Sequence, residues 1–162
     1  MKTMMMFIFL CIVSLTAQTI DLHILETTDV HTYLLDYDYY NDSSAQAFGL
    51  VHTAYLIDQY RNQHENILLF DNGDWAQGTP MSDYIAKIEG LPKGAIHPYI
   101  RAVNALQYDA LGLGNHEFNY GLPFLYRMIQ DAIPPVLCAN IQPIYEQAPW
   151  KPYVILKKQC ID

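Results

Sequence analysis

Short apolar runs that look like β-strands alternate with longer helix-like segments, and this alternation constrains the fold of the chain more than any other feature. Strands are expected at residues 20–27, 67–70, 108–113 and 136–141, with a fifth at 153–157. Helices are expected at residues 47–63, 80–88, 98–106 and 122–132. This order predicts an α/β fold with a largely parallel sheet, because a parallel connection needs a crossover segment that is usually a helix.

The pattern of apolar residues differs between the first two expected strands. Ile20, Leu22 and Ile24 alternate with polar residues, which predicts a strand with one buried face. Residues 67–70 form a continuous apolar run, typical of a strand that is buried on both faces. Residues 32–44 are rich in tyrosine and aspartate and lack a helical period, so we expect a long loop of a kind that usually serves a function.

Three polar motifs directly follow three of the expected strands. They are Asp29-Val30-His31, Asn72-Gly73-Asp74 and Gly114-Asn115-His116-Glu117. Ligands of α/β proteins bind outside the carboxyl ends of parallel strands. We therefore expect these distant segments to meet at one rim of the sheet.

The side chains of these motifs suit a pair of divalent metal ions. They supply two aspartates, two histidines and an asparagine, a mixed oxygen and nitrogen set that fits manganese, iron, zinc, cobalt or similar ions. Paired ions of this kind commonly hydrolyse phosphate esters. Taken alone, Asp29 or Asp74 would be interpreted as a turn or helix-cap residue, and only the joint pattern favours a metal centre.

Charge and hydropathy restrict the partners of the chain. The net charge is −8 and the Lys and Arg residues do not cluster, which argues against a nucleic-acid polymer as partner. A small-molecule nucleotide substrate remains compatible, because bound cations would invert the local field. No segment after residue 17 is long and apolar enough to suggest a membrane span.

The first 17 residues have the order of an export signal. Lys2 precedes an apolar run from Met4 to Val13, and small residues follow up to a cleavage point expected after Ala17. A buried first strand or helix is the alternative interpretation. The prediction is an exported, periplasmic protein whose single domain covers residues 18–162. Cys138 is expected to be a buried thiol in a strand, although a pair with Cys160 is possible in an exported protein.

The extended motifs resemble those of the calcineurin-like metallophosphoesterases. The similar segments are residues 26–31, 71–80 and 113–121, and they are closest to the periplasmic 2′,3′-cyclic-nucleotide 2′-phosphodiesterase/3′-nucleotidases of bacteria. The resemblance covers almost all of the chain after residue 17. It implies the amino-terminal half of an α/β/β/α sandwich and hydrolysis of 2′,3′-cyclic nucleotides and 3′-nucleotides in nucleotide catabolism.

The resemblance also implies roles for individual residues. Asp29 and His31 would bind the first metal ion, Asp74 would bridge the two ions, and Asn115 would bind the second. His116 would be the catalytic residue that protonates the leaving oxygen or stabilises charge on the phosphoryl group.

Two further residues of this resemblance would act around the histidine. Glu117 would lie behind the metal ligands and orient His116. Asn119 occupies a position where related 5′-nucleotidases usually have an aspartate, which favours the cyclic-phosphodiesterase branch.

The resemblance leaves part of the metal centre unaccounted for. The family requires further histidine ligands downstream, and no histidine follows His116 in this sequence. The second half of the sandwich and the carboxy-terminal nucleotide-binding domain are also missing. We therefore expect an amino-terminal part of a larger enzyme that needs the rest of that enzyme as its partner, with weak metal binding and little turnover alone. The alternatives are a 5′-nucleotidase or UDP-sugar hydrolase, and a non-catalytic truncated product.

Overall fold

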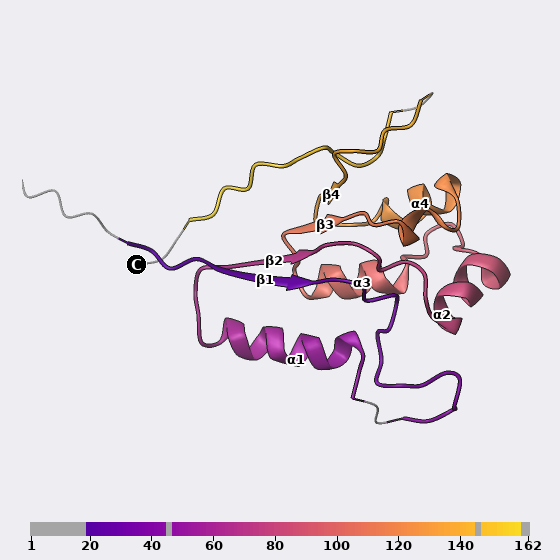
Figure 1. Ribbon diagram of the computed structural model, residues 1–162, viewed down its shortest axis with the longest axis horizontal. Coiled ribbons are helices and arrows are strands. Elements are labelled where there is room, and N and C mark those ends of the chain that lie inside the picture. Colours follow the sequence, from indigo (N-terminus) through magenta and orange to yellow (C-terminus); the bar gives the residue numbers. More distant parts are fainter. Residues whose placement is uncertain (1–18, 45–46, 145–146, 160–162) are drawn as a thin grey trace, which may run out of the picture.

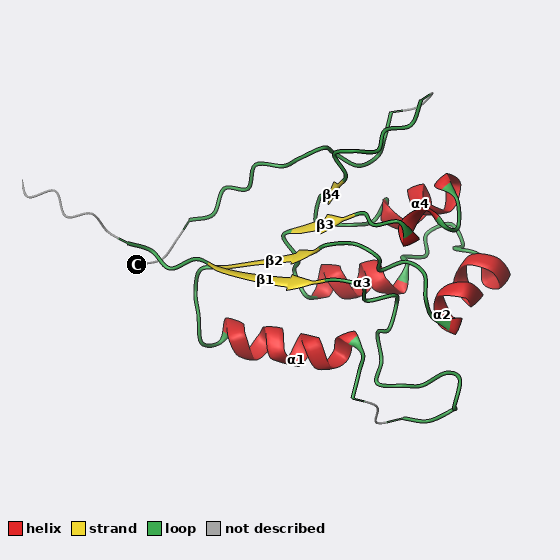
Figure 2. Cartoon of the chain, in the orientation of Figure 1, coloured by secondary structure: helices red, strands yellow, loops and turns green. Residues whose placement is uncertain are grey.

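The computed structural model describes residues 19–44, 47–144 and 147–159, and it contains four strands and several helices in alternation (Figure 1, Figure 2). The predicted export signal and Cys160 lie outside these residues. The strands are β1 (His23–Thr27), β2 (Ile67–Asp71), β3 (Ala110–Gly112) and β4 (Val136–Leu137). The α-helices are α1 (Leu50–Arg61), α2 (Pro80–Asp83), α3 (Pro98–Ala105) and α4 (Leu122–Ile129). A π-helix, Tyr84–Glu89, continues α2, and a 3-10 helix spans His116–Phe118.

The four strands form one sheet in the order β1-β2-β3-β4, and every neighbouring pair is parallel. The register pairs Thr27 with Asp71 and Asp71 with Leu111, so the carboxyl ends of β1, β2 and β3 lie at the same edge. Figure 1 shows β1 and β2 side by side, with their carboxyl ends directed toward the part of the molecule that holds α2 and α4. The predicted α/β fold with a parallel sheet is confirmed.

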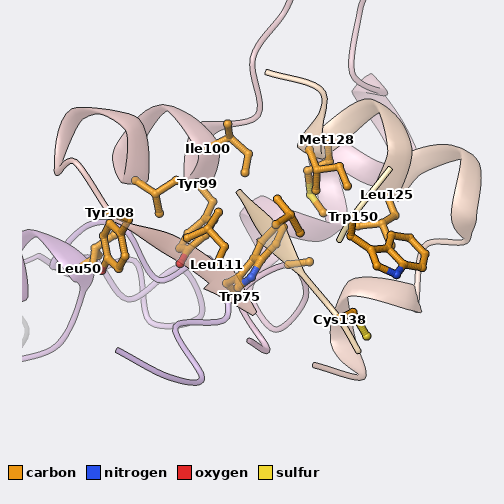
Figure 3. Packing of buried hydrophobic residues seen from close by; sticks show 14 of the residues in the cluster. Leu50, Trp75, Tyr99, Ile100, Tyr108, Leu111, Leu125, Met128, Cys138 and Trp150 are labelled. Atoms are coloured by element: carbon orange, nitrogen blue, oxygen red, sulfur yellow. The ribbon is translucent and has the colours of Figure 1, made fainter. Parts of the chain in front are cut away.

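The hydrophobic core lies between the sheet and the helices. Trp75 and Tyr99 are fully buried and stack with their ring centroids 4.8 Å apart (Figure 3). Leu111 of β3 and Leu125 and Met128 of α4 also have no exposed surface. Because Trp75 follows Asp74 directly, the core holds the backbone beside one of the predicted metal ligands.

The buried face of β1 is opposite to the face predicted from the sequence. Ile24 is 63% exposed, and Ile20 and Leu22 are also exposed, whereas Leu25 packs against the core. The period of two was recognised correctly, but periodicity alone does not say which face is covered. In β2, one face is buried, and Leu68 and Phe70 on the other face are partly buried, so the expectation of burial on both faces holds only in part.

The predicted fifth strand at residues 153–157 was wrong. Residues 153–159 have no regular structure, and only an isolated parallel bridge joins Leu137 to Lys151. Helix α2 begins as expected, because Thr79 caps it and Pro80 occupies its first turn. Helix α1 is shorter than expected and starts at Leu50.

Cys138 is a free, buried thiol, as predicted, although it lies just beyond β4. Among the residues that the structure describes, no helix has the length and apolarity needed to cross a membrane.

Candidate active site at the carboxyl ends of the strands

The loops that follow β1 and β2 are joined to each other by backbone hydrogen bonds. The Asp29 N–H donates to the carbonyl of Gly73 at 3.0 Å, and the His31 N–H donates to the carbonyl of Asp74 at 3.0 Å. Asp29, His31 and Asp74 all have positive φ angles, between 50° and 59°. Such angles are unfavourable for residues other than glycine and cluster at functional sites. The structure therefore places the backbones of three predicted metal ligands next to one another, in a conformation that is unfavourable for their residue types.

The ring of His31 is oriented so that one nitrogen is available to a ligand. Its Nδ1 lies 2.5 Å from the backbone carbonyl oxygen of Gln77. A carbonyl oxygen can only accept, so Nδ1 carries the proton and Nε2 keeps its lone pair. Nε2 lies 3.7 Å from Oδ1 of Asp29. A histidine nitrogen with an available lone pair beside a carboxylate is a suitable start for a metal site, since metal-binding histidines commonly donate their other N–H to a carbonyl.

Asp74 connects the loop after β2 to the loop after β3. Its Oδ1 accepts a hydrogen bond from the His116 backbone N–H at 3.0 Å. The two loops approach so closely that a Cβ atom at Gly73 would collide with the backbone nitrogen of Gly114, and one at Gly114 would collide with the Asp74 carboxylate. Glycine is therefore required at both positions.

The buried side chain of Glu117 forms hydrogen bonds with the backbone of the same two loops. Its carboxylate is fully buried and accepts hydrogen bonds from the backbone N–H groups of Asp74, Trp75, Ala76 and Gly114, at 2.6–2.9 Å. Burial raises the pKa of this carboxyl, and the four hydrogen bonds oppose that rise. These contacts make Glu117 a clamp on the backbone of the site. Its predicted role in orienting the His116 ring stays a prediction.

The rings of His116 and His31 lie next to each other in an edge-to-face arrangement. Their ring centroids lie 4.9 Å apart at an angle of 78°. The Nδ1 atom of His116 lies 3.0 Å from the amide nitrogen of Asn119 and 3.3 Å from the amide oxygen of Gln77. The ring of the predicted catalytic residue is thus held on one side by two amides.

The predicted ligands do not yet form a complete metal centre. Within residues 19–44, 47–144 and 147–159, no group of three or more His, Cys, Asp or Glu side chains is close enough to hold an ion. The Asn115 side chain is exposed, and no hydrogen bond to another described residue holds it. The donor types of Asp29, His31, Asp74 and Asn115 fit a divalent ion, but their metal-binding roles stay predictions.

Sequence reasoning missed two residues that shape the site. Gln77 contacts both histidines, through its backbone oxygen and its side chain. Thr32 is buried, and its hydroxyl donates to the backbone carbonyls of Trp75 and Ala76. The left-handed conformation of Thr32, with φ 58°, could not be seen in the sequence. Gln77 lies inside a motif segment, but the position of a glutamine in the sequence does not predict which residues its amide will contact.

A hollow beside Asp29 opens between β1 and the start of α1. Its aromatic lining includes Tyr33, Tyr40 and Phe48, of which Tyr33 and Phe48 contact each other edge to face at 5.3 Å. The tyrosine-rich loop, which we expected to be functional, therefore borders the predicted metal ligands.

Comparison with known proteins gives a consistent set of relatives. The chain is 47% identical over 150 residues to a 2′,3′-cyclic-nucleotide 2′-phosphodiesterase/3′-nucleotidase of Salmonella typhimurium and 46% identical over 141 residues to one of Yersinia enterocolitica. These matches cover 92% and 86% of the chain but only 23% and 22% of the relatives. No protein-family model matches the chain.

A solved structure has the same fold. The crystal structure of the calcineurin-like phosphoesterase YfkN from Bacillus subtilis superposes with a TM-score of 0.80 at 46% identity, and the match covers 88% of this chain and 44% of that one. The chain thus corresponds to less than a quarter of its curated relatives and less than half of this structure.

Proposed function

We propose that this chain, which is homologous to the amino-terminal region of bacterial 2′,3′-cyclic-nucleotide 2′-phosphodiesterase/3′-nucleotidases and has the fold of a calcineurin-like phosphoesterase, provides half of the active site of a metal-dependent phosphoric ester hydrolase. The substrates proposed are 2′,3′-cyclic nucleotides and 3′-nucleotides. The remaining metal ligands and the nucleotide-binding domain would come from the rest of a longer protein.

One observation carries the proposal: the loops after β1, β2 and β3 converge and leave His31 Nε2 free beside the Asp29 carboxylate. Asp29 and His31 would hold one ion, with Asp74 between the two ions and Asn115 at the second. Bound divalent ions would polarise the phosphoryl group and activate a water molecule. His116 would donate a hydrogen bond to the ester oxygen that leaves, and the aromatic hollow beside Asp29 would face the organic part of the substrate.

Metal binding to this chain can be measured without turnover. We expect weak binding of Mn²⁺ by isothermal titration calorimetry, because only part of the ligand set is present. Asp29→Ala and His31→Ala should each abolish it, whereas His52→Ala on α1 should leave it unchanged. Binding that survives both site variants would contradict the proposed first metal position.

Catalysis tests the substrate class. The chain alone with Mn²⁺ should show little or no hydrolysis of 2′,3′-cyclic AMP, and brisk hydrolysis would show that the site is more complete than we propose. A complete enzyme that contains this chain should hydrolyse 2′,3′-cyclic AMP and 3′-AMP faster than 5′-AMP or UDP-glucose. The opposite order would favour the 5′-nucleotidase or UDP-sugar hydrolase alternative.

We further propose that residues 1–17 direct export to the periplasm. Mass spectrometry of the protein expressed in a bacterium should find a mature amino terminus at Gln18 in the periplasmic fraction. A cytoplasmic protein that still starts with Met1 or Lys2 would contradict the assignment.

A further inference from the structure

Three aromatic side chains gather at the amino end of β1, at the end of the sheet opposite to the candidate site. His23 is the first residue of β1, Tyr60 lies in the last turn of α1, and His64 lies in the connection from α1 to β2. The ring centroids of His23 and His64 are 4.2 Å apart, and the Tyr60 ring lies 4.2 Å from His64 and 5.5 Å from His23. We call these residues the His23–Tyr60–His64 cluster.

Backbone hydrogen bonds hold the two histidines of the cluster next to each other. The His64 N–H donates to the carbonyl of Tyr60 at 3.0 Å, and the His23 N–H donates to the carbonyl of Asn66 at 2.8 Å. The connection between α1 and β2 is therefore tied to the helix and to the start of β1 (Figure 1). Both imidazoles are partly buried, so part of each ring is open to solvent.

The cluster is separate from the proposed hydrolytic site. β1 runs from His23 to Thr27, and four steps along a strand span roughly 13 Å. The loop that carries Asp29 and His31 follows the far end of that strand. A ligand at the cluster would therefore not touch the hydrolytic site, and an inference about it does not rest on the proposed function.

Both imidazole rings have a nitrogen available for a ligand. Nδ1 of His23 lies 2.8 Å from the Tyr60 hydroxyl. The hydroxyl can accept a hydrogen bond from Nδ1, as the oxygen partners of metal-binding histidines commonly do, and Nε2 then keeps its lone pair. Among the described residues, no hydrogen bond or ion pair occupies a ring nitrogen of His64.

The spacing of the rings indicates which ion they fit. A metal–nitrogen bond of about 2.0 Å places the centre of an imidazole ring about 3 Å from the ion. Ring centres 4.2 Å apart then subtend an angle of about 85° at a shared ion, whereas a tetrahedral ion such as Zn²⁺ would need them about 5 Å apart. Ligands at right angles are typical of square-planar or tetragonal Cu²⁺, which imidazole also binds more tightly than other divalent first-row ions.

We propose that His23 and His64 bind one Cu²⁺ ion as neighbouring ligands at the amino end of β1, and that Tyr60 is a positioning residue that holds the His23 ring for this contact. Two protein ligands leave the remaining positions of the ion to water. The ion should therefore exchange with solution and should not be required for folding.

Paramagnetic broadening of nuclear magnetic resonance signals locates the ion. The chain is labelled with ¹⁵N-histidine and carries His31→Ala, so that the candidate active site does not compete. Up to one equivalent of Cu²⁺ should broaden the ring signals of His23 and His64 together and leave the buried His97 sharp. Sharp signals for His23 and His64 would overturn the proposal, and so would Zn²⁺ that displaces Cu²⁺ at an equal concentration.

Phenylalanine substitutions test whether the two rings share one ion. His64→Phe keeps an aromatic ring in the cluster but removes its nitrogen ligands, so His23 should lose most of its broadening at the same Cu²⁺ concentration. His52→Phe on α1, at an exposed position, is the matched control and should change neither signal. Broadening of His23 that persists in His64→Phe would exclude a shared ion. Because His64 lies in a loop, this test does not depend on a substitution within β1.

Tyr60→Phe tests the positioning role. It keeps the ring and removes the hydroxyl beside Nδ1 of His23, so Cu²⁺ should bind about 10-fold more weakly, in line with the loss of a hydrogen-bond partner behind a metal-binding histidine. Thermal melts of the metal-free variant check that α1 still packs against β1. An unchanged Cu²⁺ affinity would overturn the role of Tyr60.

Discussion

At the scale of single residues, Glu117 shows how one buried carboxylate can hold a site together. Four backbone N–H groups from two different loops donate hydrogen bonds to its two oxygen atoms. Without an acceptor these donors would be buried and unsatisfied, which costs about 1–3 kcal/mol for each group. Glu117 therefore determines the relative position of the loops that carry Asp74 and His116.

Glu117→Gln should destabilise the chain. One carboxylate oxygen becomes an NH₂ group that faces backbone donors, so we expect the free energy of unfolding to fall by about 1–3 kcal/mol. Urea denaturation followed by circular dichroism measures this change. The matched variant Glu89→Gln, at an exposed position, should stay within about 0.5 kcal/mol of the parent chain. Equal stabilities for the two variants would contradict the claim that the Glu117 carboxylate stabilises the two loops.

His97 makes the stability depend on pH. It caps α3 and is almost fully buried, and burial lowers its pKa from the usual 6.5 to about 4. Below pH 6.5 the unfolded chain therefore binds a proton that the folded chain does not, so stability falls as the pH decreases toward 4. Between pH 7 and 4.5 this group should remove about 2–3 kcal/mol from the free energy of unfolding.

The variant His97→Asn separates this contribution from that of the carboxyl groups. Asparagine can still cap α3 but does not titrate, so the variant should lose less stability than the parent chain between pH 7 and 4.5. Urea denaturation at the two pH values gives the difference. Parallel pH profiles for the two proteins would show that His97 is protonated equally easily in the folded and unfolded states.

At the scale of elements, the sequence predicted the kinds and order of helices and strands because turn chemistry and periodicity are local. The cap at Thr79 and the strand that ends at Asp71 are examples. The covered face of β1 and the missing fifth strand depend on which neighbours are present, and local patterns do not contain that information. For the candidate site, the motif residues were identified by type and spacing, whereas Gln77 acts through a backbone carbonyl and an amide that have no such pattern.

Because the loops after β2 and β3 approach each other closely, adding one methyl group at Gly73 should lower the stability of the chain. Gly73→Ala places a Cβ against the backbone nitrogen of Gly114 at a φ of 104°, so unfolding should become easier by more than about 1 kcal/mol. Gly94→Ala is the matched control, because Gly94 also has a positive φ but no atom lies near its Cβ direction. Thermal melts compare the two. A larger loss in Gly94→Ala would mean that the loops are not in contact.

At the scale of the whole molecule, apolar surface remains uncovered in the described part of the chain. Ile24 on β1 and Ile155 near the end of the described residues are 63% and 76% exposed. β1 is also an edge strand of the four-stranded sheet. Exposed edges with apolar side chains favour association between copies, so we expect this chain to self-associate through the edge of β1.

Ile24→Lys should reduce self-association of this chain and leave its stability within about 0.5 kcal/mol, because the side chain already faces solvent. Leu25→Lys, one residue further on, should unfold the chain, because Leu25 packs against the core. Light scattering and urea denaturation measure the two effects. Undiminished scattering in Ile24→Lys would exclude the β1 edge as the surface of association.

The stacking of Trp75 on Tyr99 gives the candidate site an optical reporter. One of only two indoles in the protein adjoins Asp74 in the chain, and Glu117 accepts from its backbone N–H. We expect a ligand that moves Asp74 to shift this indole relative to the Tyr99 ring on which it stacks. Tryptophan emission, with Trp150 replaced by phenylalanine, should therefore report binding of the proposed cation in real time without a label.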